Sequence, residues 1–279
     1  MCWGAMGLAY PFQSLMSVES SVSTERDFMK RLTLALTTAT LLAIAMPVGA
    51  FDLSNLSEDE RNAFRDEVRA YLMDNPEVIM EAVSVLEARQ DAQKSVDDLQ
   101  LVQTNAEDLF SDGFSHVAGN PDGDVTIVEF VDYRCGYCRK SYEEVQALLE
   151  KDSGIRLILK EYPILGEDSL ASARFAVSAQ QLFGEDAYDK LHHALITLRG
   201  AASVDNLVAT ADGLGLDGQA IADGMSSDKV DAILGANHAL ARRLQISGTP
   251  AFVMGEVLAR GYMPLAQMEQ FVEEIRNTN

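Results

Sequence analysis

The chain contains 279 residues, of which 47% are hydrophobic, and it carries a formal net charge of −21. The hydrophobic content excludes a wholly disordered chain, and the acidic balance argues against nucleic acid as a partner, because a phosphate backbone attracts Lys and Arg. The only cysteines are Cys2, Cys135 and Cys138, which are too few for a disulfide scaffold or for a zinc site with four thiolate ligands.

The first fifty residues contain a predicted signal peptide. A Lys-Arg pair precedes an apolar run over residues 32–46, and small residues follow it as far as Ala50. This order is typical of a secretory signal, and the run is shorter than the roughly 20 residues that span a bilayer. We therefore expect a signal over residues 29–50, cleaved near Ala50, with residues 1–28 as an upstream extension before a start at Met29. Export would place the mature chain in the periplasm, where disulfides form.

Residues 51–112 form a predicted helical leader that carries sixteen acidic and only five basic side chains. Ser57, followed by three acidic residues, predicts a helix start, and this helix should run to about Met73. The sequence Asn-Pro-Glu at residues 75–77 predicts a second start. The second helix could continue to Phe110, because neither Pro nor Gly interrupts it.

The second leader helix has one narrow apolar stripe. Helical spacing relates Ile79, Val83 and Leu86, and it returns over residues 92–109 after a phase slip. A helix of this kind cannot bury its stripe alone. The stripe could pack on the catalytic domain of the same chain or on other copies of the chain, as a homo-oligomer through residues 76–110, and the spacing fits both alternatives.

A strand–helix–strand unit follows the leader and opens a predicted catalytic domain over residues 113–279. A turn cluster at residues 119–123 marks the boundary, and the β-branched run over residues 125–131 predicts a buried strand. A helical stretch then extends to about Lys151, and residues 155–159 predict the next strand. Two strands joined by a helix in this way are expected to be parallel.

The remainder predicts a helical insertion and a closing β-β-α unit. Residues 167–245 have a helical pattern with glycine breaks, which places the insertion at about 164–246. Residues 251–254 and 257–262 predict an antiparallel hairpin, and a last helix follows over about 264–277. The predicted fold class is therefore α/β.

The pair Cys135 and Cys138 carries most of the functional information. It lies between a predicted strand and a predicted helix, so the first sulfur meets the unpaired amides of a helix N-terminus, which stabilise a thiolate. Arg134, Arg139 and Lys140 add positive charge around it. The second thiol, one turn along, is placed to resolve a mixed disulfide.

Two other interpretations of the pair are a structural disulfide and half of a metal site. A bridge over two residues constrains little chain and stabilises poorly. A zinc site needs further ligands, and His192 and His193 point in different directions from a predicted helix. These interpretations are weaker than redox chemistry, and we predict no resident metal and no cofactor other than the Cys135–Cys138 disulfide.

Two further residues agree with redox chemistry. Glu129 lies on a strand that should be buried, where a proton acceptor near the second thiol is a plausible role, although a Glu near a strand end can also reach water. Pro250, after Ser-Gly-Thr at a strand entrance, suggests a sharp turn or a cis bond.

With these residues together, the chain resembles the DsbA-like thiol:disulfide interchange proteins. The resemblance rests on residues 129–138, Glu-Phe-Val-Asp-Tyr-Arg-Cys-Gly-Tyr-Cys, and on Gly-Thr-Pro at residues 248–250. The acidic leader, with Tyr-Leu-Met-Asp-Asn-Pro-Glu at residues 71–77, looks like the ScsC-type branch, named for suppression of copper sensitivity. The resemblance covers essentially all of residues 55–278, and it implies a thioredoxin fold with an inserted helical subdomain.

The resemblance also implies roles for single residues. Cys135 would be the exposed attacking sulfur and Cys138 the resolving one, and Glu129 matches the buried acid of the family. Thr249 would offer main-chain contacts to an extended client segment, and Pro250 would be the cis-proline beside the disulfide. Between the cysteines, Gly136 and Tyr137 stand where strongly oxidising members usually have Pro-His.

The sequence therefore predicts an exported thiol:disulfide oxidoreductase that acts as an oxidase or an isomerase. Its expected partners are client proteins with thiols or disulfides and a membrane redox partner. The alternative is a metal-tolerance protein whose dithiol holds a soft ion such as Cu(I).

Overall fold

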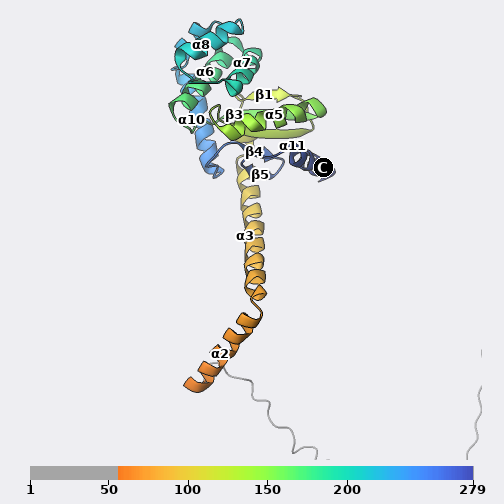
Figure 1. The fold of residues 1–279 in the computed structure, drawn as a ribbon. Coiled ribbons are helices and arrows are strands. Elements are labelled where there is room, and N and C mark those ends of the chain that lie inside the picture. The colour runs from red at the N-terminus through yellow and green to blue at the C-terminus, as the bar shows by residue number, and fades with distance from the viewer. Residues whose placement is uncertain (1–55, 279) are drawn as a thin grey trace, which may run out of the picture. The chain divides into compact units, whose positions relative to one another are not determined.

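The protein is described here from a computed structural model that covers residues 56–278 (Figure 1). The predicted signal peptide and its cleavage site lie outside these residues. The chain divides into two units between Pro76 and Glu77.

Helix α2 (Glu58–Asp74) forms the described part of the first unit. Ser57 and Glu60 build a capping box, in which the Ser57 hydroxyl accepts from the Glu60 amide and the Glu60 carboxylate accepts from the Ser57 amide at 2.9 Å. The helix buries none of its residues, and Phe64, Val68 and Tyr71 expose large apolar side chains on it.

The second unit begins with α3 (Glu77–Thr104) and the short helix α4 (Ala106–Phe110). The expected single helix to Phe110 is therefore wrong, because the chain breaks at Asn105. The Asn105 side-chain amide donates to the Leu101 carbonyl at 2.8 Å, and its oxygen accepts from Arg243 at 2.6 Å. The unit also starts earlier than the expected residue 113, because Val102 and Leu109 are buried in a core beneath the sheet.

The sheet has five strands in the order β1-β3-β2-β4-β5. Its strands are β1 (His116–Gly119), β2 (Val125–Val131), β3 (Ile155–Glu161), β4 (Ala251–Met254) and β5 (Val257–Arg260). Strands β2 and β3 are parallel, as the β-α-β pattern predicts, and the other pairs are antiparallel. Strand β1 was not predicted from the sequence, because this four-residue edge strand has no sustained apolar run.

Helices cover both faces of the sheet. On one face, α5 (Gly136–Lys151) and α11 (Leu265–Thr278) pack over alternate strand residues such as Ile127 and Val131. On the other face, Val128 and Phe130 pack with α3, α4 and α10 (Asp228–Arg243). Because side chains alternate along a strand, Glu129 shares the α5 face with Ile127 and Val131.

The expected helical insertion lies between β3 and β4. Its helices are α6 (Glu167–Phe183), α7 (Glu185–Thr197), α8 (Val204–Gly213), α9 (Gly218–Gly224) and α10. Gly184 joins α6 to α7 with a φ of 84°, a conformation that favours glycine. Figure 1 shows α6, α7 and α8 gathered beyond the β1 edge of the sheet. At the opposite edge, α3 contacts the edge strand β5.

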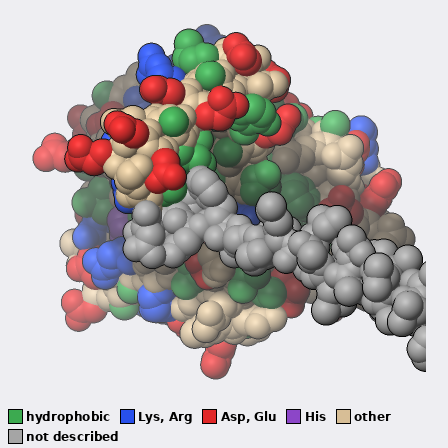
Figure 2. All heavy atoms as spheres, turned by 90° about the horizontal axis from the view of Figure 1, so that it is seen from below, with side chains coloured by type: hydrophobic (Ala, Val, Ile, Leu, Met, Phe, Trp, Pro, Cys, Tyr) green, Lys and Arg blue, Asp and Glu red, His purple; other side chains and the backbone are tan. Residues whose placement is uncertain are grey.

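Within residues 56–278, no helix combines the length and the apolar character needed to cross a membrane. Acidic side chains are spread over the face seen in Figure 2, with hydrophobic side chains exposed among them.

Candidate active site

Cys135 is the N-cap residue of α5 and directly follows the turn that leaves β2. Its backbone is extended, with φ −74° and ψ 120°, and its own amide donates to the Asp132 carbonyl at 3.1 Å. The Cys135 carbonyl accepts the Arg139 amide at 3.1 Å, which begins the helix. The sulfur therefore lies where the free amides of the first turn point, as the sequence predicts.

The surroundings of the two thiols give them opposite acidities. A hydrogen bond from Cys138 lowers the pKa of Cys135 to about 5, with help from Thr249 and from the amides of Cys138 and Tyr137, against the opposing effect of burial. The same hydrogen bond and burial raise the pKa of Cys138 far above its usual value of 9.0. Both thiols are free, and Cys135 is 7% exposed whereas Cys138 is fully buried. The expectation that the attacking sulfur is exposed is therefore wrong, because Cys135 keeps only slight exposure in this reduced state. At neutral pH, one nearly buried thiolate is paired with one fully buried thiol.

The loop before β4 supplies the other wall of the site. The Thr249–Pro250 peptide bond is cis, which is the conformation that the resemblance implies. In its protonated form, the Cys135 thiol donates to the Thr249 carbonyl, with 3.2 Å between sulfur and oxygen. The buried Thr249 hydroxyl has no other hydrogen-bond partner among the described residues, so it can donate to the sulfur once Cys135 is ionised, which lowers the pKa of that thiol.

Glu129 lies in the core on the α5 side of the sheet and is only 4% exposed. Burial raises its pKa to about 8, so the carboxyl group is mostly protonated at neutral pH. Its charge, when present, adds to the factors that raise the pKa of Cys138. The interpretation of Glu129 as a strand-end residue that reaches water is therefore wrong.

Between the cysteines, Gly136 and Tyr137 are both on the surface. A side chain added at Gly136 would meet nothing within 4 Å, so no steric contact requires glycine there. Tyr137 is 64% exposed, and its ring lies 6.4 Å from that of Tyr262. Lys140 lies over the Tyr262 ring at 4.1 Å, so an aromatic and basic surface adjoins the entrance to the site.

Arg134 and Arg139, on either side of the cysteine pair, both contact other groups of the protein. The Arg139 guanidinium donates to the Tyr133 carbonyl at 2.9 Å, and Arg134 lies 3.7 Å from the Asp168 carboxylate. The largest contributions to the acidity of Cys135 come from hydrogen bonds rather than from these charges.

Asp132, which was not predicted to be a site residue, is a buried carboxylate that organises the turn. It accepts from the Arg134 amide at 2.8 Å, and its other oxygen accepts from the Ile164 and Leu165 amides at 2.8 and 3.1 Å. It thus fixes the active-site turn to the entrance of the helical insertion. An acidic residue directly after a buried strand was the available signal.

A buried network behind the turn was also missed. The hydroxyls of Tyr133 and Tyr188 donate to one oxygen of Glu161 at 2.6 and 2.5 Å, and Tyr133 lies 2.9 Å from His192 Nδ1. Burial raises the pKa of Glu161 to about 8 and lowers that of His192 to about 3. The members come from the turn after β2, from β3 and from α7, so local sequence gave no sign that they meet.

Among residues 56–278, no group of three or more His, Cys, Asp or Glu side chains is arranged to hold a metal ion. The adjacent His192 and His193 make separate contacts, with Tyr133 and Tyr142 respectively.

Two family models match the chain. The model described as "Thioredoxin" matches residues 111–274, and the model described as "Copper resistance protein ScsC N-terminal domain" matches residues 60–93. The second match lies on α2 and the first half of α3.

Solved structures resemble the same regions. A thioredoxin-like oxidoreductase from Silicibacter pomeroyi is 38% identical, with a TM-score of 0.58, over 61% of this chain and 97% of its own. The thiol-disulfide exchange protein α-DsbA2 from Wolbachia pipientis is 25% identical, with a TM-score of 0.62, over 66% of this chain and 98% of its own. BcfH from Salmonella enterica Typhimurium is 25% identical, with a TM-score of 0.65, over 78% of this chain and 96% of its own.

Among curated proteins, a Na(+)/H(+) antiporter NhaA from Salinispora arenicola is 27% identical over 138 residues, and one from Salinispora tropica is 25% identical over the same length. The match covers 49% of this chain, which spans about a fifth of the length of these relatives, 21% in both cases.

Proposed function

Because the chain belongs to the thioredoxin family and is a DsbA-like thiol–disulfide oxidoreductase of the ScsC type, we propose that it exchanges disulfides with client proteins in the periplasm through Cys135 and Cys138. The observation that carries the proposal is the placement of the Cys135 sulfur at a helix N-cap, with its pKa lowered to about 5, directly beside Thr249. A sulfur in this state is both a nucleophile at neutral pH and a good leaving group.

As an oxidase, the protein starts with a Cys135–Cys138 disulfide. A client thiolate attacks the Cys135 sulfur, the bond between the cysteines breaks, and the electron pair leaves on Cys138. Because the pKa of Cys138 is high, its thiolate takes up a proton, and the neutral Glu129 carboxyl on the same face of the sheet is a fitting donor. A second client thiolate then attacks the client sulfur, and Cys135 leaves as a thiolate while the client gains a disulfide.

As an isomerase or reductase, the protein starts reduced and the Cys135 thiolate attacks a client disulfide. One client sulfur leaves as a thiol, and a second client thiol or Cys138 resolves the mixed disulfide. Resolution by Cys138 needs its proton removed, and Glu129 in its ionised form is a fitting acceptor. Thr249 is placed to meet an extended client segment beside the attacked sulfur.

The decisive experiment compares Cys135→Ala with Cys138→Ala in the refolding of a reduced client and of a client with scrambled disulfides. Cys135→Ala should abolish both reactions, whereas Cys138→Ala should accumulate mixed disulfides that are visible on non-reducing gels. Wild-type turnover by the Cys135 variant would overturn the assignment.

We propose that the chain self-associates through residues 76–110, along the apolar stripe of α3. Whether the protein oxidises or isomerises its clients would depend on this self-association. Ile79, Val83 and Leu86 are 52%, 40% and 55% exposed, so this half of the stripe is unpartnered within the described chain. Several active sites in one assembly would favour isomerisation. Light scattering should show an oligomer for the wild-type protein and a smaller species for Val83→Glu. In activity assays, the variant should lose isomerase activity and retain oxidase activity. A monomeric wild-type protein would select the oxidase.

Export and the redox partner are parts of the same proposal. A periplasmic thioredoxin-like protein from Salmonella enterica Typhimurium resembles this chain, at 26% identity with a TM-score of 0.52, which supports the same compartment. Protein recovered from the periplasm should begin near Phe51, and a full-length chain in the cytoplasm would contradict this. A membrane redox partner would restore the Cys135–Cys138 pair after each turnover.

A soft-metal function is the second candidate, because the match over residues 60–93 is to a domain described as belonging to a copper resistance protein. The two free thiols could hold a Cu(I) ion. Metal analysis of the reduced protein loaded with Cu(I) decides this: one tightly bound ion that is lost in Cys135→Ser would support metal binding.

A further inference from the structure

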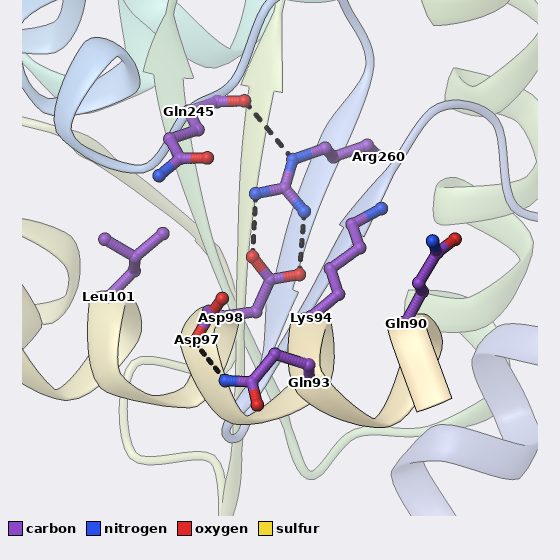
Figure 3. Close-up of a pocket in the computed structure, with 8 residues that line it drawn as sticks. All are labelled: Gln90, Gln93, Lys94, Asp97, Asp98, Leu101, Gln245 and Arg260. Atoms are coloured by element: carbon purple, nitrogen blue, oxygen red, sulfur yellow. Dashed lines mark hydrogen bonds and ion pairs between the residues drawn. The ribbon is translucent and has the colours of Figure 1, made fainter. Parts of the chain in front are cut away.

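The Arg260 side chain joins helix α3 to the loop that carries Thr249. Its guanidinium group donates two hydrogen bonds to the Asp98 carboxylate, at 2.7 and 2.8 Å. It also donates to the carbonyl groups of Leu244 and Gln245, at 3.0 and 3.3 Å. Figure 3 shows the Asp98 carboxylate and the Arg260 guanidinium facing each other, with the Gln245 carbonyl on the far side of the arginine.

The clamp, by which we mean Asp98 with Arg260, is largely withdrawn from water. The Asp98 side chain is 13% exposed and that of Arg260 is 24% exposed. A forked, partly buried pair of this kind is stronger and more directional than the usual surface ion pair. The next turn of α3 continues the attachment, because Val102 is buried in the same hydrophobic core cluster as Leu244 and Leu258.

Arg260 and the next residue, Gly261, make hydrogen bonds to both ends of the loop that carries Thr249. Residues 244–245 close α10, and Gln245 is the one non-glycine residue with positive φ, 55°, in the described chain. At the other end, Gly261 donates its amide to the Pro250 carbonyl at 2.9 Å, and Arg260 pairs with Ala251 across the sheet. The four residues between these anchors, 246–249, include Thr249, whose carbonyl lies 3.2 Å from the Cys135 sulfur.

We propose that Asp98 and Arg260 are positioning residues for thiol–disulfide exchange, through which the leader helix sets the position of the Thr249 loop against Cys135. The leader is then a structural part of the client-binding site as well as an attachment for other copies. Without the Asp98 carboxylate, the guanidinium loses the partner that orients its fork, and its two contacts to the loop weaken. The position of Thr249 relative to the Cys135 sulfur then becomes more variable. The proposal rests on exchange at Cys135, as proposed above.

Asp98→Asn tests the clamp, and Asp108→Asn is its matched control. Asp108 also lies in the leader and pairs with an arginine of the catalytic unit, Arg243, but this arginine touches Asn105 and not the loop. Asp98→Asn should raise KM for a client disulfide about fivefold with kcat nearly unchanged, in line with the coupling expected of directly contacting groups. It should also move the pH profile of Cys135 alkylation to higher pH, because a displaced loop weakens the hydrogen bond from the Thr249 side chain that helps to keep that thiol acidic.

Arg260→Lys provides an independent test, because it keeps the positive charge and removes the fork. It should reproduce the changes in KM and in the alkylation profile, and the double variant Asp98→Asn/Arg260→Lys should be no worse than Arg260→Lys alone. The proposal is overturned if Asp98→Asn leaves both readouts unchanged, if Asp108→Asn changes them equally, or if the two single effects add. If the wild-type protein exchanges no disulfides, the proposed function fails, and the alkylation profile still tests the clamp.

Discussion

The Cys135 sulfur lies 3.2 Å from the carbonyl oxygen of Thr249, although 114 residues separate the two in sequence. One residue caps a helix after the central strand of the sheet, and the other ends a loop that follows the entire helical insertion. Their contact puts the acidic thiol, the backbone of the loop before β4 and the protected second thiol in one place.

The acidity of Cys135 depends first on Cys138. In the reduced protein, ultraviolet titration of the thiolate should give a pKa near 5 for Cys135. Cys138→Ala removes the largest contribution, so the pKa should rise towards 9 while staying below it, because the amides of Tyr137 and residue 138 remain. Ser141→Ala is the control, since this buried serine lies on α5 one turn further along. An equal rise in the control would contradict the assigned cause.

The same titration predicts how redox state affects stability. A thiol with pKa near 5 in the folded state and near 9 in the unfolded state binds fewer protons when folded, so the reduced form gains stability as pH rises through this window. The Tm of the reduced protein minus that of the oxidised protein should therefore increase between pH 5 and 8. A constant difference across this range would show that the thiolate is not specially stabilised.

Glu129 should control proton transfer at Cys138. Its pKa of about 8 means that its basic form is populated only as pH rises through that value. In single-turnover experiments, resolution of a mixed disulfide by Cys138 should accelerate over this range, and Glu129→Gln should slow it by at least about tenfold at pH 8. The formation of the mixed disulfide by Cys135 is the internal control and should keep its rate. Equal slowing of both steps would indicate a general loss of structure.

Glu161 should make the fold less stable as pH rises above neutral. Its carboxyl group is held protonated to about pH 8, whereas an unfolded Glu ionises near 4.5, so the folded state holds an extra proton between these values. Stability should fall with rising pH in this window, by at most about 1.4 kcal/mol per pH unit for one proton. Below pH 6.5 the neutral His192 has the opposite effect, and in the reduced protein so does Cys135, so the oxidised protein between pH 6.5 and 8 gives the clearest test.

Glu161→Gln should flatten this slope, because the amide oxygen still accepts from Tyr133 and Tyr188 and carries no charge. Urea unfolding at several pH values measures it, with the exposed Glu150→Gln as the control. A slope that is unchanged in Glu161→Gln would assign the pH dependence to other groups, with Glu129 as the first to test.

Lys160 should contribute strongly to the free energy of unfolding of the catalytic unit. Its ammonium group is fully buried and donates to the Asp112 carboxylate at 2.5 Å and to the Asp108 carbonyl at 2.7 Å. Lys160→Met leaves Asp112 without its cation, which should cost about 3 kcal/mol. Lys151→Met removes the exposed pair with Glu269 and should cost less than about 1 kcal/mol. Similar losses measured by urea unfolding would argue against the buried pair.

The sequence alone determined the parts of this protein that depend on near neighbours. The β-branched run before Cys135, the helix start after it and the proline at the entrance of β4 are local signals, and they predicted the redox pair and its position at a helix N-terminus. The same kind of signal predicted the parallel β2–β3 pair and the helical insertion. It also led to an error at Asn105, where a good helix-forming run is interrupted because the asparagine side chain bonds to Leu101 and Arg243.

Only the tertiary structure decided which distant groups meet. The carboxylate of Asp98 reaches Arg260 across 162 residues, and Tyr133 meets Glu161 and His192 from three separate elements. Such contacts depend on strand order, register and helix packing, which the whole chain fixes together and no short window of sequence records. The reactivity of Cys135 combines both levels, because its helix amides are local while Thr249 is brought to it by the fold.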